Sequence, residues 1–304
     1  MEQLKKRIIF HIDVNSAFLS WEAVFRLSQD KKALDLRDVP SAVGGDRASR
    51  HGIVLAKSTP AKKYGITTGE PLAQALKKCP DLIVVPSRFE VYHDFSQRLL
   101  QILEEYTPDI EKFSIDEAFL DMTSTIHLFG EPVTVADQIR ERVKKELGFT
   151  VNVGIAPNKL LAKMASDFEK PDRCHTLWTE EIPQKMWPLP VRDLFFVGAS
   201  AEKKMQSIGI HTIRDLAHCD LQILKFHLGD KYAAQILCYA NGIDEDPVAK
   251  REPVSKGYGN SITLSRDVSD YDTAFQVLLS LCETVGIRLR KDNVLCSCVC
   301  VELK

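Results

Sequence analysis

Two acidic residues inside an apolar segment place the strongest constraint on how this chain can fold. The segment from Phe113 to Met122 has the sequence F-S-I-D-E-A-F-L-D-M, in which Asp116 and Glu117 interrupt side chains that favour burial. Burying a carboxylate is costly unless a cation or hydrogen bonds compensate for the lost water. We therefore predict a β-hairpin over residues 110–121 whose bend carries the two acids at the edge of a core.

A third carboxylate follows another apolar strand. Residues 7–12, R-I-I-F-H-I, predict a buried strand, and Asp13 ends it. If the hairpin pairs with this strand, three carboxylates meet at one end of a sheet and repel each other unless divalent cations bind. Oxygen ligands without His or Cys suit Mg²⁺ or Mn²⁺, and two such ions ~4 Å apart suit nucleotidyl transfer. Alternatively, the acids lie at exposed strand ends and coordinate nothing.

Strands and helices alternate up to residue 168 and predict an α+β sheet with helices packed on one face. Thr59 and Pro60 predict the start of a short helix, with Thr59 as its cap. Further helices are expected at 88–106, 134–147 and 158–168, and further strands within 39–57 and at 149–155.

The character of the chain changes after K-P-D at 170–172. Residues 179–241 predict short helices, and the polar segment 243–256 with its two prolines predicts a linker. A strand, a helix and a strand are expected at 257–265, 271–291 and 294–303. Because so short a β-α-β unit buries little surface, we expect this last domain to be incomplete.

The bulk composition is that of a globular protein rather than a membrane protein. Apolar residues make up 44% and charged residues 27% of the 304 residues, and no apolar run approaches the ~20 residues that span a bilayer. We expect a cytoplasmic protein that does not associate with membranes. The eight cysteines form no C-x-x-C pair and predict small buried thiols. With a net charge of −2, any polyanion must be bound by local patches.

Three segments resemble the signatures of the Y-family translesion DNA polymerases, in their bacterial polymerase IV and UmuC branches. They are I-I-F-H-I-D-V-N-S-A-F at 8–18, F-S-I-D-E-A-F-L-D at 113–121 and N-V-G-I-A-P-N-K-L-L-A-K-M-A-S-D at 152–167. The resemblance implies a right-hand polymerase with a ferredoxin-like palm, small fingers, an all-helical thumb and a partial βαβ little finger. The implied divisions are palm 1–16 and 84–172, fingers 17–83, thumb 173–241, linker 242–255 and incomplete little finger 256–304.

The resemblance also implies an activity and its partners. The chain would be a template-directed DNA polymerase of low fidelity that passes damaged bases. Asp13, Asp116 and Glu117, with the backbone carbonyl of Val14, would hold two Mg²⁺ ions, which Mn²⁺ can replace. The primer 3′-hydroxyl would attack the α-phosphate of a dNTP. Primer–template DNA, the dNTP and, for the full-length protein, a sliding clamp are the expected partners of a monomeric enzyme.

Several residues are expected to contact the nucleotide. Phe18 would be the gate that excludes a 2′-hydroxyl by steric clash, although its helical spacing from neighbouring aromatic residues also suits a core position. Lys159, at the start of a helix with free amides, would bind the triphosphate. Thr59 and Lys62 stand where many relatives carry Tyr and Arg, and Asn15 stands where the family often shows a second Asp.

DNA contacts are expected in two places. Residues 191–216 resemble a helix-hairpin-helix, in which Gly198, Lys203 and Lys204 would bind a phosphate, although a plain helical hairpin fits the same pattern. Contacts with backbone phosphates along an edge strand are expected from Lys256, Asn260, Ser261 and Arg266.

Two other functions remain open. A catalytically silent DNA-binding scaffold would share the fold but has no need for three acids. A nucleotide cyclase is suggested by V-G-G-D-R at 43–47, which partly resembles G-G-D-E-F, but we expect these residues to form a fingers loop. Mg²⁺-dependent primer extension separates the polymerase from both.

Overall fold

The computed structural model describes residues 7–45, 52–249, 255–264 and 266–303, and within them the predicted α+β fold is confirmed. Its main sheet has five strands in the order β5-β6-β1-β7-β8. β1 is central and pairs antiparallel with both neighbours. The strands are β1 (Ile9–Val14), β5 (Ile110–Lys112), β6 (Glu117–Asp121), β7 (Val151–Ala156) and β8 (Cys174–Thr176). The sequence did not predict β8.

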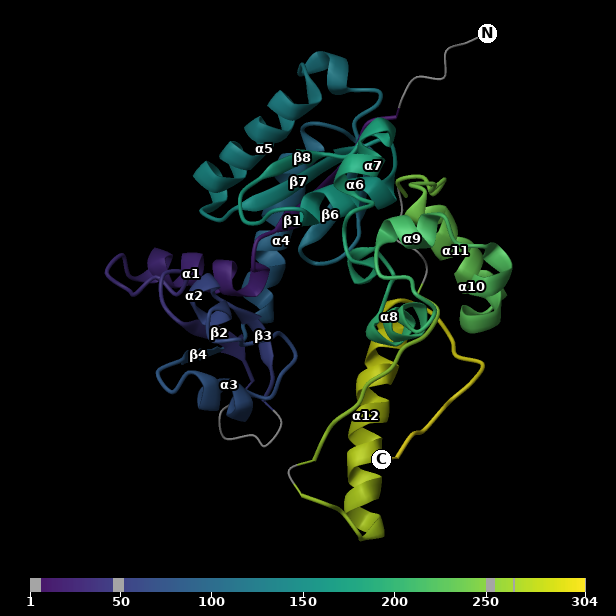
Figure 1. The fold of residues 1–304 in the computed structure, drawn as a ribbon. Coiled ribbons are helices and arrows are strands. Elements are labelled where there is room, and N and C mark those ends of the chain that lie inside the picture. The colour runs from purple at the N-terminus through teal and green to yellow at the C-terminus, as the bar shows by residue number, and fades with distance from the viewer. Residues whose placement is uncertain (1–6, 46–51, 250–254, 265, 304) are drawn as a thin grey trace.

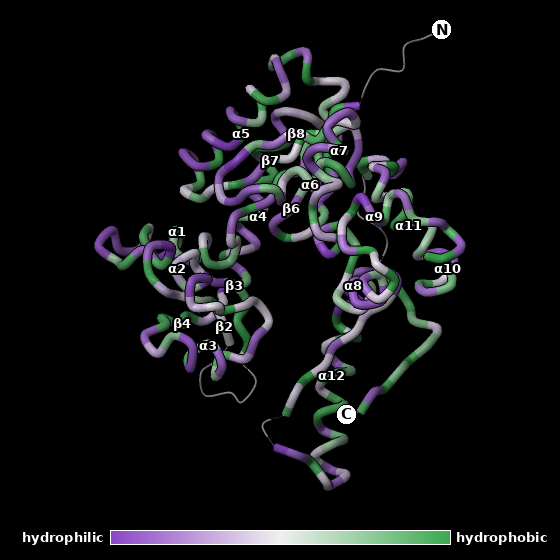
Figure 2. The backbone as a smooth tube through the Cα atoms, in the orientation of Figure 1, coloured by the Kyte–Doolittle hydropathy of each residue, from purple (hydrophilic) through white to green (hydrophobic). Residues whose placement is uncertain are grey.

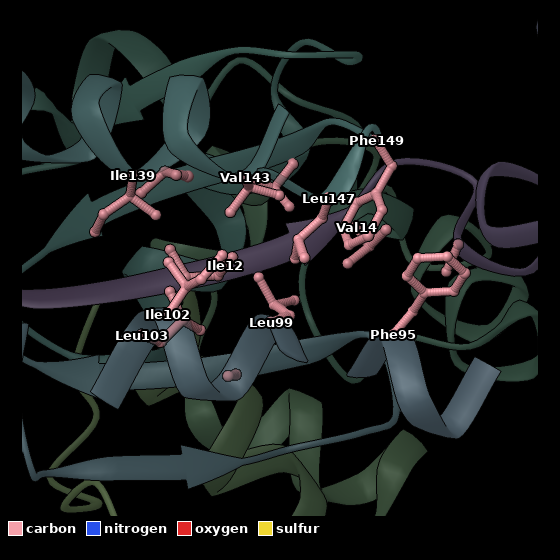
Figure 3. Packing of buried hydrophobic residues seen from close by; sticks show 14 of the residues in the cluster. Ile12, Val14, Phe95, Leu99, Ile102, Leu103, Ile139, Val143, Leu147 and Phe149 are labelled. Carbon is pink, nitrogen blue, oxygen red and sulfur yellow. The ribbon is translucent and has the colours of Figure 1, made fainter. Parts of the chain in front are cut away.

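Helices cover both faces of this sheet, so the prediction of helices on one face alone is wrong. On one face, Ile12 and Val14 of β1 pack against α4 (Phe89–Glu104) and α5 (Pro132–Leu147), as Figure 3 shows. On the other face, Ile9 packs with α6 (Lys159–Asp167). Successive side chains of a strand point to opposite faces, and every residue of β1 is buried, so both faces need a cover.

A small second unit follows the first strand. α1 (Ala17–Gln29) leads into a three-stranded sheet in the order β3-β2-β4, which has a core of its own (Figure 1). Its elements are β2 (Ser41–Gly44), β3 (Val54–Lys57), α2 (Thr59–Lys62), α3 (Leu72–Lys78) and β4 (Ile83–Pro86).

Two sequence predictions need correction in this small unit. β4 pairs with β2, so the predicted fingers boundary at residue 83 falls inside a strand. The cap of α2 is Ser58, whose hydroxyl accepts from the backbone amide of Ala61, rather than Thr59. Of the predicted fingers loop at 43–47, Val43 and Gly44 belong to β2, and residues 46–51 lie outside the described part of the chain.

The segment predicted to form short helices does so. Its helices pack around one core that continues onto α6; in Figure 1, α7 lies beside α6, and α8 to α11 lie to the right of the main sheet, whereas the small unit lies at the lower left. They are α7 (Ile182–Lys185), α8 (Ala199–Gln206), α9 (Ile213–Ala217), α10 (Leu221–Leu228) and α11 (Asp230–Ala240). Single 3₁₀ turns occur at Ile126–Leu128, Thr179–Glu181 and Val191–Asp193.

The C-terminal part contains the predicted helix but not the predicted strands. α12 (Tyr271–Lys291) forms, and Asp270 caps it. The described residues of 257–265 and 294–303 form no strand, although hydrophobic residues recur along them (Figure 2). Leu295 is 99% and Val299 77% exposed. A strand is stable when its backbone groups pair and its side chains are covered, and the described residues offer these segments no neighbouring sheet.

Candidate active site

The register of the main sheet brings the predicted acids to one end of it. Asp13 lies directly opposite Glu117 on β6 and opposite Asn152 on β7. Asp116 is in the bend just before β6, and its carbonyl accepts from the amide of Val14 at 3.1 Å. The predicted hairpin is thus confirmed, with Glu117 as the first residue of its second strand.

The three carboxylate side chains each contact a different partner. Lys170 Nζ contacts Asp13 Oδ2, and Lys163 Nζ lies 2.9 Å from Glu117 Oε1. Ser114 Oγ donates to Asp116 Oδ1 at 2.6 Å. Over the residues that the structure describes, no three His, Cys, Asp or Glu side chains are grouped closely enough to hold a metal ion. The backbones of the three acids therefore lie close together, whereas each of their side chains is bound to a different partner.

The electrostatics of Asp13 fit a cation at this place. Burial, with smaller contributions from the Glu117 and Asp167 carboxylates, raises the pKa of Asp13 to about 6 against the attraction of Lys170. For Lys170, burial alone would lower the pKa, but Asp13 and Asp167 outweigh burial and raise it. A buried carboxylate that the neighbouring lysine does not fully compensate, set among oxygen ligands, fits a hard divalent ion.

His11 is a buried polar residue at this site that sequence reasoning missed. Burial, with Lys163 and Lys170 nearby, lowers the pKa of His11 well below its ordinary value, so the ring is neutral. The Ser166 hydroxyl donates to the carbonyl of Lys163, so His11 Nδ1 donates to Ser166 Oγ at 2.8 Å. Its Nε2 lies 3.9 Å from Glu117 Oε2. The available signal was a histidine inside the apolar run 7–12.

The structure does not bring Lys159 to the carboxylates. Its Nζ binds both carboxylate oxygens of Glu111, at 2.8 and 2.7 Å. The amides expected to be free are also used, because Asn158 accepts from Leu161 and Asp244 accepts from Leu160. The lysine that reaches Asp13 is Lys170, in the K-P-D segment that the sequence marked only as a boundary.

Phe18, the predicted gate, is half-buried at the start of α1. Its ring stacks on Tyr92, with centroids 5.0 Å apart and planes 18° apart, and meets Phe89 edge-on at 5.8 Å. Tyr92 is fully buried and donates its hydroxyl to the buried carboxylate of Glu22. The contacts with Tyr92 and Phe89 therefore restrict the position of the Phe18 ring. Such contacts are compatible both with a core residue and with a rigid gate.

The remaining predicted residues lie on other parts of the molecule. Thr59 and Lys62 are on α2 of the small unit. Gly198 is the N-cap of α8, and Lys203 and Lys204 are exposed in its last turn. The residues expected on an edge strand are exposed in an irregular segment instead: Lys256, Asn260, Ser261 and Arg266.

Comparison with known families and proteins agrees with this geometry. Residues 12–167 match the impB/mucB/samB family, and residues 255–304 match the C-terminal domain of that family. The chain belongs to the impB/mucB/samB family. Residues 192–244 also match the thumb domain described for DNA polymerase-iota.

Relatives of this family member include bacterial enzymes named DNA polymerase IV. The chain is 49% identical to the one from Clostridium acetobutylicum over 298 residues, which is 98% of this chain and 74% of that protein. It is 41% identical to the one from Acetivibrio thermocellus over 302 residues, or 98% of this chain and 73% of that protein.

Solved structures with the same fold are Y-family DNA polymerases. A chimera of two such polymerases superposes with a TM-score of 0.80 at 26% identity, covering 92% of this chain and 80% of the chimera. The insertion ternary complex of Dbh DNA polymerase gives a TM-score of 0.70 at 28% identity, covering 79% of this chain and 69% of that one. The chain is therefore a Y-family DNA polymerase of the translesion type and depends on metal ions. Within the described residues, none of its helices is long and apolar enough to cross a bilayer.

Proposed function

We propose that Asp13, Asp116 and Glu117, with the carbonyl of Val14, hold two Mg²⁺ ions for the addition of dNTPs to a primer. The observation that carries this proposal is the register of β1, which sets Asp13 opposite Glu117 and joins Val14 to the Asp116 carbonyl. Residues directly opposite on antiparallel strands have Cβ atoms roughly 5 Å apart, so rotation of their side chains is enough to share ions. Mn²⁺, with the same preference for oxygen ligands, can replace Mg²⁺.

When bound, the ions activate the primer 3′-hydroxyl and stabilise the charge of the triphosphate. The protein supplies positive charge beside them. Lys170, whose side chain is 35% exposed, can leave Asp13 to bind the triphosphate of the incoming dNTP. Lys163, whose side chain is 11% exposed, neutralises Glu117. Phe18, supported by Tyr92, excludes the 2′-hydroxyl of a ribonucleotide.

The other parts of the chain bind substrates in this proposal. The main sheet is the palm and the small unit is the fingers, in which Thr59 and Lys62 face the triphosphate. The helices from α7 to α11 are the thumb, in which Gly198, Lys203 and Lys204 bind a DNA phosphate. Further phosphate contacts come from Lys256, Asn260, Ser261 and Arg266. A sliding clamp as partner, a monomeric state and a cytoplasmic location stay predictions from the resemblance.

Primer extension with Asp116→Ala tests the proposal, with Asp94→Ala as matched control. Asp94 is an exposed carboxylate on α4 that pairs with Arg98 one turn further along the same helix. We expect Asp94→Ala to extend a primer as the parent does and Asp116→Ala to extend it at least about 100-fold more slowly at every Mg²⁺ concentration. Equal extension by Asp116→Ala and the parent would overturn the metal site.

The comparisons with known proteins do not favour the two other functions considered from the sequence, a catalytically silent scaffold and a nucleotide cyclase.

A further inference from the structure

Two buried asparagines connect the carboxylate end of the sheet to the segment that carries Lys170. Asn15 follows β1 and is 8% exposed, and Asn152 lies on β7 next to Asp13 and is fully buried. The side-chain amide of Asn15 donates to Asn152 Oδ1 at 3.0 Å. Buried polar groups need such partners, because an amide without them loses its bonds to water.

Asn152 holds the chain on both sides of Lys170. Its Nδ2 donates to the carbonyls of Ser166 and Glu169 at 3.0 and 2.6 Å. Its Oδ1 accepts from the amide of Arg173 at 3.2 Å in addition to Asn15. Because the backbone partners are two carbonyls on one side and an amide on the other, they fix the orientation of the Asn152 side chain.

Asn15 adds a second attachment to the same segment. Its Oδ1 accepts from the amide of Asp172 and from the hydroxyl of Thr150, both at 2.9 Å. Asp172 has a left-handed backbone, with φ of 59°, and Arg140 binds both its carbonyl and its carboxylate at 2.8 Å. The residues before and after Lys170 in the sequence thus have backbone groups that are hydrogen-bonded to the two asparagines.

We propose that Asn15 and Asn152 are positioning residues that hold the backbone of Lys170 beside Asp13, from where its side chain reaches the triphosphate of the incoming dNTP. The proposal rests on the role given to Lys170 in the proposed function. The pair works only with an amide at position 15. A carboxylate there could still accept from Asp172, but it would put an oxygen against Asn152 Oδ1 in place of the donor.

Asn15→Asp is therefore a nearly isosteric test. The repulsion displaces Asn152, and with it the carbonyl of Glu169 and the amide of Arg173, so Lys170 moves away from Asp13. We expect the KM for dNTP to rise about tenfold while kcat changes less than about threefold. Asn152→Ala, which removes the bonds of Asn152 to Asn15, Glu169 and Arg173 without adding charge, is expected to move the KM in the same direction.

Thr150→Val is the matched control. It removes one hydrogen bond to Asn15 Oδ1 and leaves every bond between the asparagines and residues 166–173 in place. We expect its KM for dNTP to stay within about twofold of the parent. A KM that rises as much in Thr150→Val as in Asn15→Asp would overturn the proposal, since it would indicate a general loosening of the site.

A double-mutant cycle with Lys170→Ala decides whether the asparagines act through the lysine. Equilibrium binding of dNTP to complexes with a dideoxy-terminated primer is measured, because it does not depend on catalysis. If the asparagines act through Lys170, Asn15→Asp weakens binding in the parent but changes it less than about twofold in Lys170→Ala. Equal weakening in both backgrounds, or none in the parent, would refute the inference. A parent that binds dNTP without extending the primer would instead refute the proposed function, and the binding cycle would still decide the role of the asparagines.

Discussion

Gly154, in the middle of β7, sets the distance between the main sheet and α6. A Cβ added at this position would lie 1.9 Å from the carbonyl oxygen of Ala162 and 2.6 Å from the amide nitrogen of Ser166. Both are backbone atoms of α6 and cannot rotate out of the way. Real Cβ atoms essentially never come closer than 3.0 Å, so Gly154→Ala forces α6 and the strand apart by about 1.1 Å.

The displacement has a cost in stability and a consequence at the site. Overpacking a core typically costs 1–3 kcal/mol, and we expect about 3 kcal/mol here because the obstacle is backbone. For a unit of this size, 3 kcal/mol lowers the Tm by about 6–12 °C. The helix carries Lys163 and Ser166, so the contacts with Glu117 and His11 open by a similar distance and primer extension slows.

Thermal unfolding followed by circular dichroism measures the effect, with Gly257→Ala as control. A Cβ at Gly257 would meet no described atom within 4 Å, and the added methyl should leave the Tm within about 1 °C. A Tm of Gly154→Ala within 2 °C of the parent would refute the close packing of β7 on α6. A lower Tm with unchanged extension would refute the dependence of the site on the position of α6.

Three further results are expected. Phe18→Ala should incorporate ribonucleotides at least about tenfold more readily than the parent, and unchanged discrimination would exclude the gate. Ser58→Ala should destabilise the protein by about 1–3 kcal/mol, since its hydroxyl also donates to the carbonyl of Val39, whereas Thr59→Ala should have little effect on unfolding by urea. Arg140→Gln should be about 1 kcal/mol less stable than the parent at pH 7. Although burial acts to raise the pKa of Asp172, hydrogen bonds from Arg140 and Lys144 hold it below 3.8, so the difference should shrink in unfolding curves measured below that pH and persist above it.

Local pattern was sufficient to predict the parts of the site that lie on strands. The pattern of each segment predicted the acid after the first strand and the acids in the hairpin bend, whereas the pairing of those two strands was only a condition in the sequence analysis and comes from the structure. Lys170 could not be found in this way. It comes close to Asp13 because α6 runs back along β7, and the K-P-D sequence signals only the end of a helix. Lys159, at the start of α6, matches the local pattern of a triphosphate-binding lysine better than Lys170 does. The structure instead pairs it with Glu111 of β5, which the local pattern could not predict.

The C-terminal segments show that a local pattern can also predict strands that do not form. Alternating apolar residues such as those around Leu295 describe what a strand could bury, not whether a neighbouring sheet is there to cover it. β1 has the two neighbours that its pattern requires, and both its faces are covered.

The arrangement of charge explains why a sheet can keep three acids at one end and still fold. Asp13 and Glu117 are adjacent across two strands, and their repulsion would oppose the pairing of β1 with β6. Lys170 and Lys163 approach from the end of α6 and from its middle, so the helix that covers the sheet also neutralises it. Lys170 is the more exposed of the two, so in the proposed function it is the lysine that leaves Asp13 for a nucleotide triphosphate. The better buried Lys163 is suited to remain in place, and the proposed role of the asparagines is to hold the segment from which Lys170 reaches Asp13.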